Sequence, residues 1–292
     1  MREEGLVFDL SARAKLRLTG PDRLRYLNGQ VSNDLRKATE ENAIHGCVLS
    51  AKGKISADVF IASEGESFLL DSDSGMVEDL TARLDRYIIA DDVEIEDVTA
   101  EFALLHVAGV DVPAWPRDIR QRRAERFGRP GMDLWMKADL RDATLRELEK
   151  TARLCSDAEA ETLRIERGLP RWGHELTAEI IPTEANLEGS AIDYAKGCYI
   201  GQEVISRIKM SGQTNKRLCG LRVVEGPALS AGLRLMTRGE DAKEVGWITS
   251  ATASERFGQI GLGFVKRGFQ EIGSHLAVSG TVVELVTLPF AF

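Results

Sequence analysis

The sequence predicts an α+β fold whose last quarter is a small β-barrel or sandwich. In the first two thirds, segments with the two-residue period of strands mix irregularly with segments of helical spacing, unlike the strict strand–helix alternation of parallel sheets. From Lys216 onward the periodicity is almost purely β, with short runs separated by turn residues. The 292 residues suffice for two domains, and we place them at residues 1–215 and 216–292.

The N-terminal part contains several strand patterns and two helices. The first helix follows the turn Gly20-Pro21-Asp22, and Asp22 is placed to cap it. Apolar residues at helical spacing mark the second helix, and they are Met76, Leu80, Leu84, Tyr87 and Ile88. Strands are expected at residues 15–19, 43–50, 55–62, 67–71, 93–98 and 102–108.

Residues 111–131 are rich in arginine, with guanidinium groups at Arg117, Arg120, Arg122, Arg123, Arg126 and Arg129. Interleaved aromatic side chains would support an RNA-binding surface, but only Trp115 and Phe127 lie nearby. The chain is acidic, with a net charge of −8, which disfavours nucleic acid as a partner. We expect a solvated amphipathic segment here.

The remaining elements follow from standard start and stop signals. A strand is expected at residues 132–137 and a helix at 140–152. Another helix opens at Ser156, which has capping-box spacing with Glu159, and ends at Gly168. The barrel strands include residues 218–224, 245–250 and 260–265.

Composition excludes several classes of protein. No stretch approaches the roughly 18 consecutive apolar residues of a membrane span, and the N-terminus lacks the features of a secretory signal. The four cysteines, Cys47, Cys155, Cys198 and Cys219, form no CxxC pair, which argues against a disulfide framework or a zinc site. We therefore expect a soluble cytoplasmic protein without a metal site.

Common catalytic and nucleotide-binding motifs are missing. Gly53-Lys54 lacks the spacing and the following Ser or Thr of a P-loop, and no GxGxxG follows a strand. HExxH and GxSxG are also absent, and the four histidines are widely scattered. These observations disfavour the standard nucleotide-binding, zinc-hydrolase and serine-hydrolase interpretations.

Residues 163–220 carry the most specific chemistry. Glu166 and Arg167 fall in the last turn of a helix, where a carboxylate faces the negative end of the helix dipole. A ligand with N–H donors would explain such a carboxylate, and the alternative is an exposed helix-end glutamate. Residues 196–203 read KGCYIGQE. A nearby ammonium such as Lys196 stabilises a thiolate at Cys198, whereas the alternative is that this cysteine packs as a small apolar side chain.

The motif KGCYIGQE closely resembles the signature of the YgfZ folate-binding family, which is related in fold to the T-protein (aminomethyltransferase) of the glycine cleavage system. The resemblance covers nearly the whole chain, through GPDRLRYLNGQVSNDL, LSAKGKISADVFI, LRIERGLPRWGHEL, IPTEANLE and VGWITSATASERFGQIGLGFVKRG. It implies a GcvT-like three-lobed arrangement, with two interleaved α+β subdomains and a C-terminal β-barrel.

The resemblance also implies roles for individual residues. Glu166, with Arg167 beside it, would bind the pterin ring through paired hydrogen bonds. Asp58 falls where T-proteins carry an essential aspartate near the folate, and Lys196 would pair with carboxylates of the folate glutamyl tail. Cys198 would be a functional thiol, which makes Cys198, Lys196 and Asp58 the catalytic candidates. The other expected pocket residues are Asn33, Asp34, Tyr199, Gln202 and Glu203.

The implied function is binding of tetrahydrofolate, or a derivative of it, in support of iron–sulfur cluster assembly or repair. One candidate thiol cannot supply the four thiolate ligands that usually hold an iron–sulfur cluster. Contacts with client enzymes or cluster-assembly proteins would therefore be transient. We expect the protein to be a monomer. Two alternatives stay open. One is a folate-dependent aminomethyl- or methyltransferase, although Ala57 stands where T-proteins commonly have a second acidic residue. The other is an RNA- or tRNA-modification-associated factor that uses Arg117–Arg129.

Overall fold

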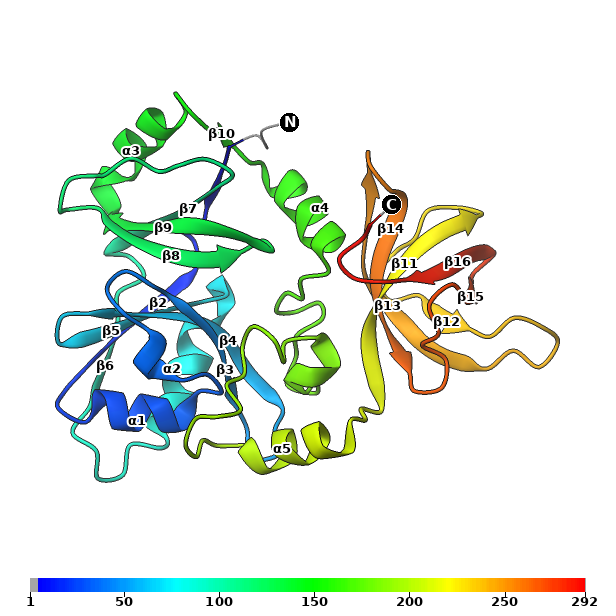
Figure 1. Ribbon diagram of the computed structural model, residues 1–292, viewed down its shortest axis with the longest axis horizontal. Helices are drawn as coiled ribbons and strands as arrows, with labels where there is room; N and C mark the ends of the chain where they lie inside the picture. Colours follow the sequence, from blue (N-terminus) through cyan, green and yellow to red (C-terminus); the bar gives the residue numbers. More distant parts are fainter. Residues whose placement is uncertain (1–4, 292) are drawn as a thin grey trace. The chain divides into compact units, whose positions relative to one another are not determined.

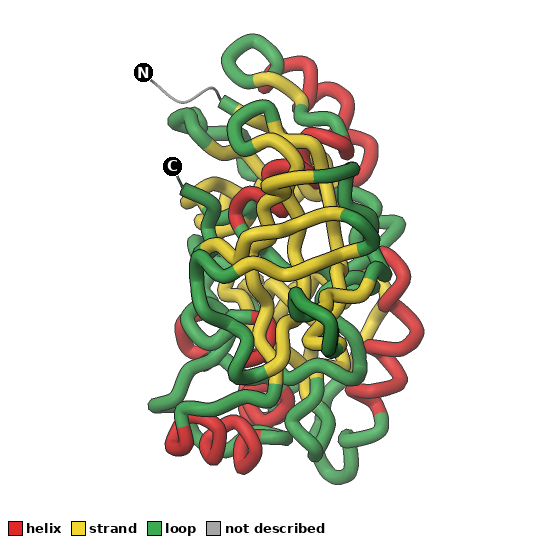
Figure 2. Tube along the Cα trace, turned by 90° about the vertical axis from the view of Figure 1, so that its right-hand side faces the viewer, coloured by secondary structure: helices red, strands yellow, loops and turns green. Residues whose placement is uncertain are grey.

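The computed structural model describes residues 5–291 and contains two five-stranded sheets and a closed barrel (Figure 1). Strands make up most of the regular structure (Figure 2). The chain forms two compact units. The first unit runs to Ser156 and also includes Gly189–Val204, and the second unit consists of Asp157–Glu188 and the chain from Ile205 onward.

The first unit holds both five-stranded sheets, and their strands are interleaved along the sequence. The first sheet has the order β10-β1-β7-β9-β8, and the second has the order β3-β4-β5-β2-β6. The strands of the first sheet are β1 (Leu6–Asp9), β7 (Phe102–Ala108), β8 (Arg120–Arg126), β9 (Arg129–Lys137) and β10 (Arg153–Leu154). Those of the second sheet are β2 (Ala14–Thr19), β3 (Ile44–Leu49), β4 (Ile55–Glu64), β5 (Ser67–Ser72) and β6 (Glu94–Asp97). All neighbours are antiparallel except β1 and β10.

Helices pack against each sheet through apolar residues. Helices α1 (Arg23–Gln30) and α2 (Val77–Asp85) accompany the second sheet. A hydrogen bond of 2.6 Å from the Tyr26 hydroxyl to the Leu84 carbonyl joins these two helices. Helix α3 (Arg141–Leu148) packs on the first sheet through Leu145 and Leu148. Asp22 occupies the N-cap position of α1 as expected, but its carboxylate accepts from the backbone N–H of Asp92 and not from the helix.

Residues 120–126 of the arginine-rich segment form strand β8, and two of its arginines are buried, which corrects our expectation of a solvated segment. Along β8, Arg122, Ala124 and Arg126 are buried, whereas Arg123 and Glu125 are exposed. Such alternation of buried and exposed residues is typical of a half-buried strand. It could not be recognised in the sequence because two of the inward-facing residues are arginines. Acidic residues of the second sheet and of β9 pair with these guanidinium groups and make their burial possible.

The second unit combines helix α4 (Asp157–Arg167) with a closed barrel of order β11-β14-β13-β12-β15-β16. Gly168, with φ of 69°, ends α4 as expected. The barrel strands are β11 (Lys216–Glu225), β12 (Arg234–Met236), β13 (Glu244–Ser254), β14 (Gly258–Lys266), β15 (His275–Val278) and β16 (Thr281–Val286). Helix α5 (Gln202–Ser211) precedes β11. Strand β11 begins at Lys216, where we placed the start of the second domain.

Short 3₁₀ turns complete the structure, and they are η1 (Leu35–Lys37), η2 (Ser74–Met76), η3 (Ala138–Leu140) and η4 (Pro182–Ala185). Between residues 5 and 291, no helix has the length and the apolar character needed to cross a membrane.

Candidate functional site

The KGCYIGQE motif lies in the loop that precedes α5, and Lys196 anchors this loop to the end of α1. The Lys196 side chain is buried, and its ammonium donates to three backbone carbonyls. They belong to Asn28, Val31 and Asn33, at 2.6, 2.7 and 2.8 Å. A cation suits this position because the carbonyl groups at the C-terminal end of a helix lack intrahelical partners.

These contacts revise the role expected of Lys196. Its ammonium has three hydrogens, and all three are used within the fold. None is left for a folate carboxylate or for a hydrogen bond to the Cys198 thiol. Burial lowers the pKa of Lys196 to about 8, against the opposing effects of Asp34 and Asp193. Lys196 is therefore a positioning residue in this structure.

Tyr199 is the second anchor of the loop. It is buried, its ring centre lies 5.1 Å from the Lys196 ammonium, and burial raises the pKa of its hydroxyl. Gly201 (φ 87°) passes so close to the turn after β3 that an added Cβ would lie 2.7 Å from the Ser50 carbonyl oxygen. This glycine therefore lets the two backbone segments pack closely. Gln202 opens α5 with a backbone bond to Tyr199, and Glu203 is exposed on the same helix.

Cys198 lies between the two anchors with an exposed side chain. The other three cysteines are buried. The alternative in which Cys198 packs in the core is wrong, because the buried residues on either side, Lys196 and Tyr199, leave Gly197 and Cys198 at the surface. The loop therefore presents one thiol to solvent.

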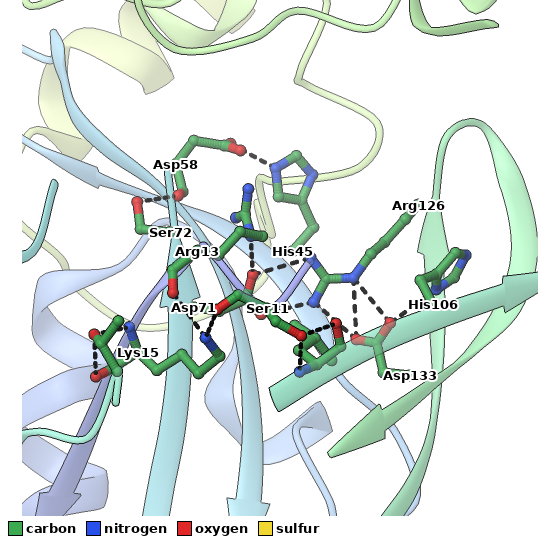
Figure 3. Close-up of polar contacts among 12 residues, drawn as sticks. Ser11, Arg13, Lys15, His45, Asp58, Asp71, Ser72, His106, Arg126 and Asp133 are labelled. Atoms are coloured by element: carbon green, nitrogen blue, oxygen red, sulfur yellow. Dashed lines mark hydrogen bonds and ion pairs between the residues drawn. The ribbon is translucent and has the colours of Figure 1, made fainter. Parts of the chain in front are cut away.

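Asp58 belongs to a polar cluster on β3 and β4 (Figure 3). Its Oδ1 lies 2.6 Å from Nε2 of His45, and its backbone carbonyl accepts from Ser72. Nδ1 of His45 lies 3.3 Å from the hydroxyl of Ser190, in the segment that leads to KGCYIGQE. No sequence pattern singles out His45, since its partners Asp58 and Ser190 lie 13 and 145 residues away.

Asn33 and Asp34 stabilise the same region. The Asn33 amide donates to the carbonyls of His45 and Ser190 at 2.8 and 3.3 Å. Asp34 caps η1 and pairs with Arg36, whose hydrogen bonds lower the pKa of Asp34 to about 2. Both residues therefore organise the backbone around Asp58 and Lys196.

Glu166 lies in the second unit, on the last turn of α4. Its side chain is buried, with a residue exposure of 8%, so the alternative of an exposed helix-end glutamate is wrong. Ser254 donates to Oε1 across 2.6 Å, and Arg256 lies 3.8 Å from Oε2. Arg167 is half-buried on the same turn. The structure thus keeps a buried carboxylate between α4 and β13 that accepts a short hydrogen bond from Ser254.

A second buried carboxylate near Glu166 was not expected. Glu175 is fully buried, and it accepts hydrogen bonds from Arg164 at 2.8 Å and from Ser250 at 2.6 Å. Arg164 also pairs with Glu161. This network joins α4 to the barrel and holds the helix turn that carries Glu166.

The expected site residues therefore fall into two groups. The first unit holds Asn33, Asp34, Asp58, Lys196, Cys198, Tyr199, Gln202 and Glu203, and the second holds Glu166 and Arg167. Within residues 5–291, no cluster of three or more His, Cys, Asp or Glu side chains is arranged to hold a metal ion.

Family models match both ends of the chain. The GCVT N-terminal domain matches residues 1–114, and the glycine cleavage T-protein C-terminal barrel domain matches residues 216–290. The chain contains both GcvT-type domains. The structure of this GcvT-like protein is similar to that of aminomethyltransferase T of the glycine cleavage system from Bartonella henselae, with a TM-score of 0.85 at 18% identity. This similarity confirms the fold predicted from the sequence. The match covers 99% of this chain and 87% of that one.

Curated relatives of this GcvT-like protein have two different names. An aminomethyltransferase from Shouchella clausii is 28% identical over 309 residues, which cover 95% of this chain and 83% of the relative. The tRNA-modifying protein YgfZ from Shigella dysenteriae serotype 1 is 28% identical over 258 residues, which cover 82% and 78%. Similarity alone therefore leaves both types of activity open.

Proposed function

We propose that this GcvT-like protein binds a tetrahydrofolate derivative and supports the assembly or repair of iron–sulfur clusters in client enzymes. The observation that carries the proposal is the exposed Cys198, held between Lys196 and Tyr199 in a motif that resembles the YgfZ signature. Clients or cluster-assembly proteins would meet this thiol transiently. A free surface thiol of this kind suits a reducing compartment such as the cytoplasm.

Glu166 fits the proposed folate ligand by its chemistry. An ionised carboxylate offers about four acceptor positions, and Ser254 occupies one of those on Glu166. The remaining capacity suits a pterin edge with two N–H donors, which would bind by charge-assisted hydrogen bonds. When bound, tetrahydrofolate would supply a reduced ring system that carries one-carbon units.

Glu166→Gln is expected to weaken tetrahydrofolate binding by about 1.5–3 kcal/mol, the typical contribution of hydrogen bonds to a charged group. The amide keeps the shape of the side chain but replaces one acceptor oxygen by a donor. Isothermal titration calorimetry under anaerobic, reducing conditions measures the change. Glu255→Gln is the matched control, since Glu255 is exposed on the neighbouring turn and loses the same charge. Equal affinities of Glu166→Gln and the wild type would contradict the assignment.

Cys198→Ser is expected to abolish rescue of cluster-enzyme activity in a strain that lacks the protein. The melting temperature should stay within about 1 °C of the wild type, because substitutions at exposed positions rarely alter stability. Ala195→Ser provides the control, as it introduces a hydroxyl at another exposed position of the same loop. Full rescue by Cys198→Ser would exclude a role for the thiol.

The similarity to aminomethyltransferases favours a second candidate, which is folate-dependent aminomethyl transfer of the T-protein type. A glycine-cleavage assay with the partner proteins supplied separates the two candidates, since only a transferase releases ammonia from the aminomethyl intermediate. An RNA-associated role has less support, because Arg122 and Arg126 are buried in ion pairs. Salt-sensitive retention of tRNA that disappears when Arg117, Arg120 and Arg123 become alanine would support it.

A further inference from the structure

Arg122 is a buried cation on the inward face of β8. Its side chain is 1% exposed, and its one ion pair within residues 5–291 is with Glu64 on β4, where Nη2 lies 3.1 Å from Oε2. Glu64 is shared, because Arg120 lies 2.9 Å from its other carboxylate oxygen. One carboxylate therefore serves two guanidinium groups, of which the Arg122 group is the buried one.

Asp133, which lies opposite Arg122 on β9, does not complete this balance. Arg126 donates to both oxygens of Asp133, and Nδ1 of His106 lies 2.8 Å from Oδ1. Burial lowers the pKa of Arg122, although the charges of Glu64 and Asp133 oppose this effect. An arginine still stays charged at neutral pH. The charge of Arg122 is therefore only partly balanced inside the first unit.

Arg122 also has more hydrogen-bond donors than the described chain uses. A guanidinium group has five N–H bonds. Nη2 contacts Glu64 and the Ser63 carbonyl, whereas Nε and Nη1 are buried and have no hydrogen-bond partner within residues 5–291. The same is true of Nε1 of Trp135, whose ring centre lies 5.9 Å from the guanidinium carbon. Each buried donor without an acceptor costs about 1–3 kcal/mol, so these groups call for an acceptor from outside the chain.

We propose that a small inorganic anion of the halide type binds between the two sheets of the first unit, held by the N–H groups of Arg122 beside Trp135. A halide accepts several hydrogen bonds and donates none. Water would also have to place its own hydrogens on acceptors, whereas the unpartnered atoms of Arg122 and Trp135 are all donors. The negative charge of the ion would balance the second guanidinium group at Glu64. This inference does not depend on folate binding.

Bromide tests the site directly, because it resembles chloride and its anomalous scattering locates it in a crystal. Crystals of the full chain in sodium bromide should show an anomalous peak at hydrogen-bond distance from Nε or Nη1 of Arg122. Urea unfolding in sodium chloride and in sodium gluconate, at equal ionic strength, gives a second readout. Each tenfold rise of chloride above its dissociation constant should raise the folding equilibrium constant about tenfold. Gluconate is too large for a buried site and should have no such effect.

Arg122→Met should lose both the bromide peak and the chloride dependence, whereas Arg123→Met, at an exposed position of the same strand, should keep both. Water in place of the peak in wild-type crystals, together with equal stability in the two salts, would overturn the inference. This wild-type result decides the question even if Arg122→Met does not fold. A chloride effect that persists in Arg122→Met would place the ion elsewhere and would also overturn it.

Discussion

Arg126→Met is expected to lower the free energy of unfolding by about 3–5 kcal/mol, the usual effect of removing one member of a buried ion pair. Arg126 connects the two sheets of the first unit (Figure 3). It donates to Asp71 on β5 at 2.6 Å and to Asp133 on β9 at 2.8 Å. Both carboxylates are at most 1% exposed, and without Arg126 the described structure leaves Asp71 with Arg13 and Asp133 with His106 as their remaining side-chain partners.

The acid sensitivity of the protein follows from the same network. Burial alone would raise the pKa of Asp133, but the charge of Arg126 outweighs it and lowers the pKa to about 2. The folded state therefore binds this proton more weakly than the unfolded state, whose pKa is the ordinary 3.8. The resulting stability is present above pH 3.8 and is lost as the pH falls through about 2. Arg126→Met should lack this part of the acid transition.

Urea unfolding at pH 7 measures the loss, and repetition between pH 5 and pH 2 measures its acid dependence. Arg123→Met is the matched control, because Arg123 lies on the same strand with its side chain exposed. Its effect should stay within about 0.5 kcal/mol. If Arg126→Met is too unstable to purify, Arg126→Lys keeps the charge and should lose less. A change below about 1 kcal/mol in Arg126→Met would show that the network does not stabilise the fold.

Local patterns predicted the elements whose residues follow the usual polarity. The spacing of Leu80 and Leu84 predicted α2, and Gly168 marked the end of α4. The arginine strand β8 was missed because Arg122 and Arg126 occupy inward positions, where apolar residues are the usual choice. These positions can be recognised as buried only from their ion pairs with residues of other strands. Ion pairs between residues far apart in the chain leave no local sequence pattern.

The sequence suggests candidate site residues, whereas the contacts that hold them are visible only in the structure. The motif around Cys198 was recognisable because its spacing is specific, and its exposure agrees with a functional thiol. His45 was not recognisable, since its partners Asp58 and Ser190 are 13 and 145 residues away. The role of Lys196 was misjudged for the same reason, because it bonds the carbonyl of Asn28, 168 residues away.

Lys196→Met is expected to lower the free energy of unfolding by about 2–4 kcal/mol, since a buried carbonyl that loses its donor costs about 1–3 kcal/mol and the two part-buried carbonyls of Asn28 and Asn33 cost less because water can reach them. The substitution leaves the carbonyls of Asn28, Val31 and Asn33 without their shared donor. Methionine has a similar length, so most of the packing against Tyr199 is kept and the loss reports on the hydrogen bonds.

The rate of Cys198 alkylation by iodoacetamide separates the two roles that Lys196 could have. If Lys196 stabilised the Cys198 thiolate, its loss would slow alkylation at pH 7–8. The three carbonyl contacts of Lys196 predict instead that the alkylation rate does not fall, while urea unfolding shows the lower stability. Lys52→Met, at an exposed lysine, should change neither quantity. Slower alkylation of Lys196→Met with unchanged stability would restore the electrostatic role, because an anchor that bonds three carbonyls cannot be removed without cost to the fold.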